Sequence, residues 1–475
     1  MNKLSIFAFS IFFTASLNSD SAIINIPNDY PTIQQGIDAS LTGDTVVVMP
    51  GTYFENINLH GKNILLTSQF YLANDTAFIS LTIINGSMPT HPDTSSCIII
   101  VSGEDSTCIV QGFTITSGQG TKWLDAHGAG TYREGGGILI DFSSPIIRFN
   151  RIINNWATNS SGIGVAGAGG GGIRVSDGYP HILNNVIAFN QGKYGPGIVL
   201  NYTGCVMRNN LICYNSGGQT FNGGGAIWAI DNFGTYEKII ENNTIYGNKT
   251  TTGTGGILAW QTSSIIRNNI IRANTSPNNS QIYLIGGGMS AITYSNVQGG
   301  FAGNGNIDFN PLFIDTSNFY LQPLSPCVDA GDSSVVFNDV ENPGLPGFAL
   351  FPAMGTVRND MGAYGGQGVA LLGQGVTTSL YEIFLVEPEI ILYPNPATGK
   401  FNVKCSLPAG QVERFKIDKI EICDAHGKMV VNKTFEKSIS GFPSFNADIG
   451  KMDKGIYFVK IFFGDKLVTR KLSVQ

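Results

Sequence analysis

A repeated pattern of asparagine and isoleucine runs through the middle of this 475-residue chain. Each copy reads Asn, any residue, Ile, any three residues and a second Asn. Five copies begin 35, 25, 33 and 26 residues apart, at Asn150, Asn185, Asn210, Asn243 and Asn269. Their second asparagines are Asn155, Asn190, Asn215, Asn248 and Asn274. A pattern kept at such a period indicates a solenoid built from one small unit.

A glycine followed by isoleucine accompanies this pattern at a fixed distance. It lies 13 residues before the first asparagine of four copies, at Gly137, Gly172, Gly197 and Gly256. The copy that begins at Asn243 carries a few more residues and reads Gly225-Ala226-Ile227 instead. Two independent marks at one offset indicate a true structural repeat.

Composition favours short strands and turns over long helices. Glycine makes up 60 of the 475 residues, and charged residues make up 13%, about half of the usual ~25%. Glycine and asparagine tolerate positive φ and are poor helix formers. The hydrophobic content of 42% excludes a disordered chain, and glycine without a three-residue period excludes collagen.

The period predicts the architecture of the unit. About 25 residues hold three short strands and three turns, so the extra residues of longer copies map to loops. Stacked units bury a continuous apolar core at about 4.8 Å per rung. The repeated asparagines suit turns in the left-handed region, and their stacked amides can form a ladder. Leucine-rich repeats and propellers have other periods, so we predict a right-handed parallel β-helix with three sheets.

The N-terminal region contains two recognisable signals. Residues 1–21 have the pattern of a secretory signal peptide, because Lys3 precedes an apolar run that is too short to span a membrane. After it, Ile33 and Ile37 stand at helical spacing. We expect this segment to form a helix that caps the open end of the solenoid core.

Charge is distributed unevenly along the chain. The net charge is −6, but residues 392–475 carry 14 basic and 8 acidic side chains. The rest of the chain carries 14 basic and 26 acidic side chains, which argues against a nucleic-acid partner. None of the seven cysteines lies in a CxxC pair, so no zinc site is indicated and isolated buried thiols are expected.

Six segments before residue 366 carry recognisable motifs. They are Tyr30-Pro-Thr-Ile-Gln-Gln-Gly-Ile-Asp38, Gly43-Asp-Thr-Val46, Pro50-Gly-Thr-Tyr-Phe-Glu-Asn-Ile57, Asn310-Pro-Leu-Phe-Ile-Asp315, Ser325-Pro-Cys-Val-Asp-Ala-Gly331 and Arg358-Asn-Asp-Met-Gly-Ala-Tyr364. Together they resemble pectin-lyase-like parallel β-helix proteins, in particular uncharacterised secreted bacterial proteins of this fold. The resemblance covers residues 22–365 and implies the same β-helix.

The catalytic motifs of enzymes with this fold are missing from the sequence. Asp141-Phe142 is followed by Ser-Ser-Pro instead of the rest of a pectin methylesterase motif, and the Asp-Asp and Gly-His-Gly motifs of polygalacturonases do not occur. Trp123-Leu-Asp125-Ala-His127 loosely resembles the Trp-Ile-Asp-His calcium site of pectate lyases, with one extra residue. No cofactor is therefore expected, and calcium is the one ion that this likeness would allow.

The C-terminal segment carries motifs of a different kind. They are Leu392-Tyr393-Pro394-Asn395-Pro396, Gly427-Lys428, Gly455-Ile-Tyr457 and Lys471-Leu-Ser-Val474. Residues 391–475 thereby resemble the type A sorting domain of the bacterial type IX secretion system. Alternation of apolar residues from Tyr457 predicts a small antiparallel β-sandwich, after a linker at residues 366–390. The resemblance implies the type IX machinery as a partner, and a protein that is secreted or held on the outer-membrane surface of a Bacteroidota-type Gram-negative bacterium.

The strands that follow the repeat glycines supply candidate carbohydrate-binding residues. Their second and fourth positions should point outward. This face would carry Asp141, Arg174, Asn201, Trp228 and Trp260. Arginine pairs with carboxylates and flat aromatic rings stack on sugars, so the face suits an acidic glycan. An ordinary solvated sheet face is the alternative.

A polar insertion between Gly118 and Glu134 is the second candidate. It contains Lys122, Asp125, His127, Tyr132 and Arg133. Loops on a rigid scaffold often carry function, and lysine, histidine, tyrosine and arginine are able to remove a proton next to a uronate carboxylate. A polar surface loop without function is the alternative.

Together these patterns predict an exported β-helix protein that binds an extracellular polysaccharide. The alternative is a polysaccharide lyase or glycoside hydrolase that acts on a uronate polymer through a non-standard site. Because the known catalytic motifs are missing, the sequence favours polysaccharide binding over catalysis.

Overall fold

The computed structural model describes residues 21–73, 75–157, 168–218, 221, 223–232, 235–278, 281–371, 389–406, 419–424, 428–434, 445–448, 452–463 and 466–475. The chain divides into two compact units, Met1–Thr378 and Ser379–Gln475. Nearly all of the expected signal peptide and the middle of the expected linker lie outside the described residues. Within these ranges, none of the helices has the length and apolar character that a membrane crossing requires.

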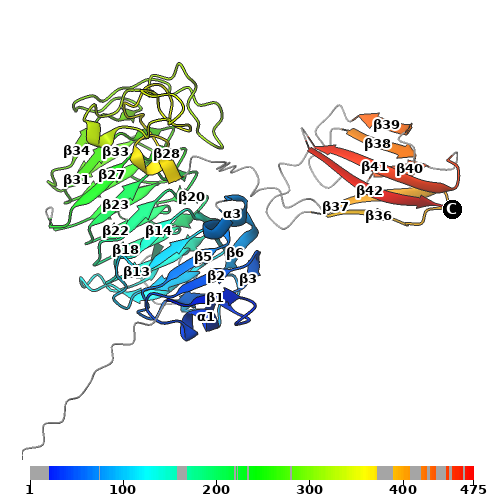
Figure 1. Ribbon diagram of the computed structural model, residues 1–475, viewed down its shortest axis with the longest axis horizontal. Coiled ribbons are helices and arrows are strands. Elements are labelled where there is room, and N and C mark those ends of the chain that lie inside the picture. Colours follow the sequence, from blue (N-terminus) through cyan, green and yellow to red (C-terminus); the bar gives the residue numbers. More distant parts are fainter. Residues whose placement is uncertain are drawn as a thin grey trace, which may run out of the picture. The chain divides into compact units, whose positions relative to one another are not determined.

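Three long parallel sheets form the first unit, and successive strands of each rung belong to different sheets (Figure 1). As far as the chain is described, sheet 1 contains β1 (Ile23–Ile26), β2 (Thr45–Val48), β5 (Leu65–Ser68), β9 (Ile109–Gln111), β14 (Ile146–Arg148), β19 (His181–Leu183), β23 (Cys205–Arg208), β27 (Lys238–Glu241), β31 (Ser264–Arg267) and β34 (Ala291–Thr293). Sheet 2 contains β3 (Gly51–Tyr53), β6 (Thr82–Asn85), β10 (Thr114–Thr116), β15 (Arg151–Ile153), β20 (Val186–Ala188), β24 (Leu211–Cys213), β28 (Thr244–Tyr246), β32 (Ile270–Arg272) and β35 (Asn296–Val297). Sheet 3 contains β4 (Ile57–Asn58), β8 (Ile98–Ile100), β13 (Ile138–Asp141), β18 (Ile173–Ser176), β22 (Ile198–Asn201), β26 (Ile227–Ile230), β30 (Ile257–Trp260) and β33 (Ile282–Ile285). This is the predicted parallel β-helix.

Two smaller sheets flank the solenoid. One consists of β7 (Thr94–Ser95), β11 (Gly120–Leu124), β12 (Thr131–Glu134) and β17 (Ala168–Gly169). The other consists of β16 (Trp156–Ala157), β21 (Gln191–Gly192), β25 (Ser216–Gly217) and β29 (Lys249–Thr250). Because β11 and β12 form an antiparallel hairpin, the polar insertion expected as a loop is largely extended.

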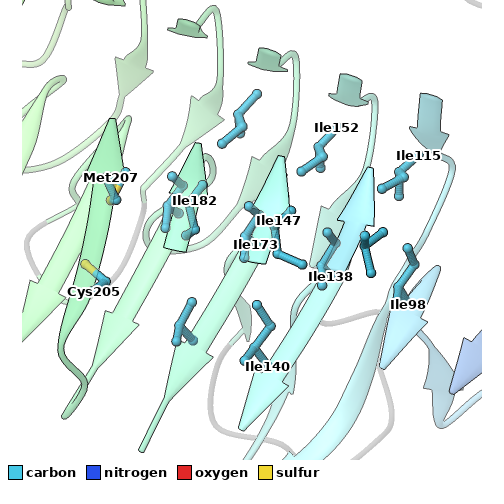
Figure 2. Close-up of a cluster of buried hydrophobic side chains, with 14 of the residues drawn as sticks. Ile98, Ile115, Ile138, Ile140, Ile147, Ile152, Ile173, Ile182, Cys205 and Met207 are labelled. Carbon is cyan, nitrogen blue, oxygen red and sulfur yellow. The ribbon is translucent and has the colours of Figure 1, made fainter. Parts of the chain in front are cut away.

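Columns of isoleucine fill the interior of the solenoid. The register aligns Ile138 with Ile173 in sheet 3 and Ile152 with Ile187 in sheet 2, and all four side chains are fully buried. Figure 2 shows such side chains pointing inward from neighbouring rungs. Each rung therefore adds its apolar residues to one continuous core, which no single rung could bury.

The repeat asparagines form two ladders along the solenoid. Asn150, Asn185, Asn210 and Asn243 each donate a side-chain hydrogen bond to the asparagine of the next rung, at 2.9–3.2 Å. The expectation that these asparagines occupy the left-handed region is wrong. The preceding residue does so instead, for example Asn209 with φ 56° before Asn210. The side chain of the ladder asparagine must face inward to reach the next rung. The left-handed backbone conformation of the turn is therefore adopted by the preceding residue, whose side chain faces outward.

The repeat glycines lie where rungs approach each other closely. A Cβ at Gly172 would come within 2.6 Å of the carbonyl oxygen of Gly197 and 3.0 Å of the ladder amide of Asn190. A Cβ at Gly197 would meet Ala226 and Asn215 in the same way. The contact with the second asparagine of the repeat explains why the two sequence marks keep a fixed distance.

Helices and irregular segments cover the ends and one edge of the solenoid. The described helices are α1 (Ile33–Ala39), α2 (Phe70–Ala73), α3 (Ala77–Leu81), η1 (Val335–Phe337) and η2 (Gln367–Leu371). The predicted helix is α1, which buries Ile33 and Ile37 and is capped by Thr32. Residues 359–366 lie along the corner between sheets 1 and 2, where Asn209 Nδ2 donates to the carbonyl of Gly365 at 2.7 Å.

The cysteine side chains that the structure describes are buried and unpaired. Six side chains are free thiols, at Cys97, Cys108, Cys205, Cys213, Cys327 and Cys423. Burial raises the pKa of Cys97 and Cys205 to about 12. These thiols therefore stay protonated and unreactive at neutral pH, as expected for structural cysteines.

The second unit is the predicted small antiparallel sandwich. One sheet contains β36 (Glu389–Tyr393), β37 (Lys400–Ser406) and β40 (Phe445–Asp448), and the other contains β39 (Met429–Thr434), β38 (Lys419–Asp424), β41 (Gly455–Phe463) and β42 (Lys466–Val474). Phe401 and Val403 of the first sheet share one buried core with Ile420, Val459 and Leu472 of the second.

Candidate functional site

The face of sheet 3 that was expected to bind sugar is covered. Register pairs Leu139 with Arg174 and Asp141 with Ser176, so the predicted neighbours do lie side by side. However, Asp141, Arg174, Asn201 and Trp228 are only 1–8% exposed. These four side chains point away from the solenoid core, as predicted, but they are open neither to a glycan nor to solvent.

The hairpin of β11 and β12 supplies the cover. The indole Nε1 of Trp123 in β11 donates to Oδ2 of Asp141 at 2.5 Å. At the hairpin tip, the carboxylate of Asp125 accepts from Asn201 Nδ2 at 2.8 Å. Both contacts hold the insertion down on the strands that follow the repeat glycines.

Arg174 is enclosed by carboxylates beneath this hairpin. Its guanidinium lies 3.1 Å from Glu134, 3.3 Å from Asp141 and 3.6 Å from Asp125. The side chain is only 3% exposed, so it has no free edge for a uronate carboxylate. The predicted role of Arg174 as a glycan ligand is corrected accordingly, because protein carboxylates already occupy its donors.

Glu134 carries a strongly perturbed carboxyl group in this cluster. Burial raises its pKa to about 7, although Arg174 acts in the opposite direction. Its second oxygen accepts a hydrogen bond from the hydroxyl of Tyr194, and the pKa of Tyr194 is raised well above 10 by burial and by Glu134. Sequence reasoning used Glu134 only as the end of the insertion and missed this role.

The remaining residues of the insertion have diverse surroundings. Lys122 is exposed, whereas Tyr132 and Arg133 are buried. Arg133 donates to the backbone carbonyls of Gly120 and Pro92. His127 binds Asp177 through Nε2 at 2.9 Å and stacks on the ring of Tyr202 at 3.9 Å. The insertion thus uses its polar side chains mainly to attach itself to the solenoid.

The two predicted tryptophans belong to an apolar cluster beside Arg174. Trp228 is 5% exposed, and its Nε1 donates to the carbonyl of Phe221 at 2.9 Å. Trp260 is half-buried and packs against the same cluster. Neither presents a fully open ring face, so their stacking role is not supported by this geometry.

A calcium site at the Trp123–His127 segment does not fit these contacts. Asp125 already accepts from Asn201 and from backbone N–H groups of the hairpin, and Arg174 lies beside it. A cation would be repelled by the guanidinium. Elsewhere in the described ranges, His, Cys, Asp and Glu side chains form no group of three or more suited to a metal.

An open pocket of about 510 Å³ lies at the ends of two strands of sheet 2. Tyr246 and Arg272 come from the ends of β28 and β32, and Phe313 comes from an irregular segment that folds back over them. The rings of Tyr246 and Phe313 meet at 5.8 Å in an edge-on arrangement. Gln298, Asn310 and Gln322 supply polar residues to the lining, which also includes Ala273, Pro311, Leu312 and Thr316.

Aromatic side chains continue from this pocket along neighbouring rungs. Tyr214 lies 6.3 Å from Tyr246, and Phe189 stacks on Tyr214 at 5.4 Å. Sequence reasoning missed this row because it considered only the strands after the repeat glycines. The signal was present, since Tyr214 and Tyr246 stand one position apart in the repeat of the Asn-Ile strands.

Comparison with known proteins identifies the second unit. Residues 391–475 match the family described as the secretion system C-terminal sorting domain. They are a sorting domain. A search of curated proteins found no match to the chain. Among solved structures, the chain is similar to a crystal structure of a pectin methylesterase mutant in complex with a hexasaccharide.

That similarity has 11% identity and a TM-score of 0.30, and covers 61% of this chain and 93% of the other. The β-helix assignment rests instead on the strand register of the three sheets. The sorting domain directs the protein through type IX secretion to the cell surface or the extracellular space of a Bacteroidota-type bacterium.

Proposed function

We propose that this exported protein binds polysaccharide through the pocket between Tyr246, Arg272 and Phe313. The observation that carries the proposal is the aromatic wall of the pocket, with rings at 5.8 Å that come from separate parts of the chain. Aromatic rings offer flat apolar faces to the C–H groups of a sugar. Pockets of this volume, with a few convergent polar groups, are typical of ligand sites.

The polar groups of the pocket favour an uncharged sugar. Arg272 Nη1 donates to Asp308 at 2.7 Å and to Asn296 at 2.8 Å, so its charge is balanced locally. The side-chain oxygens of Gln298 and Asn310 accept backbone N–H groups, and Nε2 of Gln322 donates to the carbonyl of Phe313. The remaining amide donors and acceptors of these three side chains can bind hydroxyl groups. A neutral sugar unit therefore matches this lining better than a uronate.

The row of Tyr214 and Phe189 supports binding of a polymer over a single sugar. Both side chains are half-buried, and they follow the strands of the two rungs that precede the pocket. Rungs are spaced by about 4.8 Å, a distance similar to the length of one sugar ring. Successive sugars could therefore meet successive rungs of the solenoid.

Titration calorimetry of neutral polysaccharides with the full chain tests this proposal. Tyr246→Ala should weaken binding about tenfold, which corresponds to about 1.4 kcal/mol. Because Tyr246 also packs on Tyr214, Gln298→Ala serves as a second variant at an exposed pocket position. Tyr283→Ala, which removes an exposed ring from sheet 3, is the matched control and should leave binding unchanged.

Two results would overturn the proposal. One is unaltered affinity for every bound glycan in both pocket variants. The other is new reducing ends or unsaturated product when the wild type is incubated with uronate polymers. That second result would favour the alternative of a lyase or hydrolase.

A further inference from the structure

The outer face of sheet 1 carries a row of alternating arginines. Register aligns the last residues of β14, β19, β23, β27 and β31 in one line across the sheet. These positions hold Arg148, Leu183, Arg208, Glu241 and Arg267. We call them the arginine row. Arginine thus recurs on every second rung.

The arginine row has an excess of positive charge. Glu241 is only 3% exposed and accepts from Nε of Arg208 at 2.7 Å and from Nε of Arg267 at 2.9 Å. Arg148 donates through Nε to the neutral Gln111 at 2.7 Å. Three guanidinium groups therefore face one carboxylate. This excess is notable because the chain before residue 392 has 14 basic and 26 acidic side chains.

The same contacts fix the orientation of the guanidinium groups and leave their Nη atoms available to a ligand. Each protein hydrogen bond found at Arg148 and Arg208, in the described part of the chain, uses Nε. Their Nη groups, which bind carboxylate or sulfate oxygens in pairs, are left for a partner. Arg208 is 45% exposed, while the guanidinium of Arg267 stacks on Phe337 at 3.9 Å. Arg148 is half-buried, with its guanidinium 5.8 Å from the ring centre of Phe149. The accessible part of the row therefore consists of the exposed Arg208 and the half-buried Arg148.

An apolar row runs beside the arginines on the same face. The aligned positions two residues before the arginine row hold Ile146, His181, Val206, Ile239 and Ile265, of which all but His181 are apolar. Most of these side chains are half-buried and lie on a sheet face that Figure 1 shows without a covering layer around β14 and β23. Apolar side chains next to arginines are suited to a ligand with both C–H faces and acid groups.

We infer that the arginine row binds a linear anionic polysaccharide in which every second sugar carries an acid group. Arginines two rungs apart are separated by about 9.6 Å, which corresponds to two sugar rings at one ring per rung. A chain lying along the solenoid axis would then present one carboxylate or sulfate to each arginine. This surface is separate from the pocket on sheet 2, so it does not depend on the function proposed there.

Binding of charged oligosaccharides to the full chain tests the inference. The probes are hyaluronan oligosaccharides, which carry a carboxylate on every second sugar, and polygalacturonate oligosaccharides with the same number of carboxylates. The Arg148→Gln/Arg208→Gln double variant should weaken hyaluronan binding at least tenfold. It should also reduce the dependence of affinity on salt. The control Lys122→Gln changes charge on another face and should alter affinity less than twofold.

Three outcomes would contradict the arginine row as this site. Equal weakening by Lys122→Gln would show general charge attraction without a defined surface. Tighter binding of polygalacturonate than of hyaluronan would exclude the alternating spacing. Duplex DNA that competes with equal affinity, and loses binding in the double variant, would indicate a nucleic-acid surface. Pocket variants such as Gln298→Ala should leave hyaluronan binding intact, which separates this site from the one on sheet 2.

Discussion

The side-chain amide of Asn210 donates to Oδ1 of Asn243 on the next rung at 2.9 Å. The same oxygen accepts the backbone N–H of Asn210 at 3.0 Å. The other amide hydrogen reaches the carbonyl of Ile182, on the preceding rung, at 2.8 Å. One buried side chain therefore joins three consecutive rungs and satisfies backbone groups that the turn would otherwise leave unpaired.

We expect replacement of a ladder asparagine to destabilise the solenoid. Asn210→Leu removes these bonds and leaves buried donors and acceptors without partners, which should lower the free energy of unfolding by about 1–3 kcal/mol. Chemical denaturation measures the change. Asn28→Leu, at an exposed position, is the control. Unchanged stability of Asn185→Leu, Asn210→Leu and Asn269→Leu alike would show that the ladder is dispensable.

Close contacts between rungs predict that alanine substitution will destabilise the protein at one glycine and not at another. Gly172→Ala would place a Cβ 2.6 Å from the carbonyl oxygen of Gly197, so the rungs must separate. We expect a loss of roughly 1–3 kcal/mol in unfolding free energy. Gly344→Ala meets only the side chain of Asn342 at 3.4 Å and should be tolerated. Equal stability of the two variants would argue against the observed rung spacing at Gly172.

The raised pKa of Glu134 predicts that the stability of the protein depends on pH. Burial raises its pKa from 4.5 to about 7, so the folded state binds the proton more tightly than the unfolded state. Stability contributed by this group is complete at low pH and declines as the pH rises from about 4.5 through 7. Glu134→Gln, which resembles the protonated carboxyl, should remove a decline on the order of 3 kcal/mol.

Denaturation of both proteins between about pH 4 and pH 8 measures this difference. Glu237→Gln, at an exposed carboxyl, is the control and should follow the wild type. A Glu134→Gln protein with the same pH profile as the wild type would mean that Glu134 is charged in the folded state throughout.

We expect removal of the sorting domain to block export across the outer membrane. A chain that ends at residue 390 should accumulate in the periplasm of its host, because the type IX machinery recognises residues 391–475. Mass spectrometry of the wild-type surface fraction should find an N-terminus near residue 22 and no peptide that contains Tyr457. An intact C-terminal domain on the exported protein would contradict this prediction.

The solenoid was predictable from the repeat because every rung makes the same contacts with its neighbours. Ile152 and its equivalents face a shared interior, and Asn155 and its equivalents meet the repeat glycines. Such contacts involve neighbouring rungs that carry similar residues at similar positions. For this reason strand register, the buried columns and the ladders could be predicted from spacing alone. The left-handed backbone conformation was predicted for Asn210, but the preceding residue, Asn209, adopts it. Both residues are asparagine, so residue type alone did not distinguish them.

Candidate site residues could be predicted much less well, for a reason that Arg174 illustrates. Alternation along a strand correctly assigned Arg174 to the outer side of sheet 3 and placed it beside Asp141. Whether that side is open depends on where an insertion of irregular length packs. The hairpin that contains Glu134 folds back over it, and the repeat pattern has no information about that contact.

The sequence by itself therefore determined the parallel β-helix, its asparagine ladders and the sorting domain, because these depend on local patterns that recur or match as a whole. Only the tertiary structure decided which surfaces are available to a ligand. It buried Arg174, brought Phe313 against Tyr246 across 67 residues of chain, and left Arg148 and Arg208 aligned two rungs apart on sheet 1. Burial and accessibility result from contacts between segments far apart in the chain, and strand periodicity does not encode them.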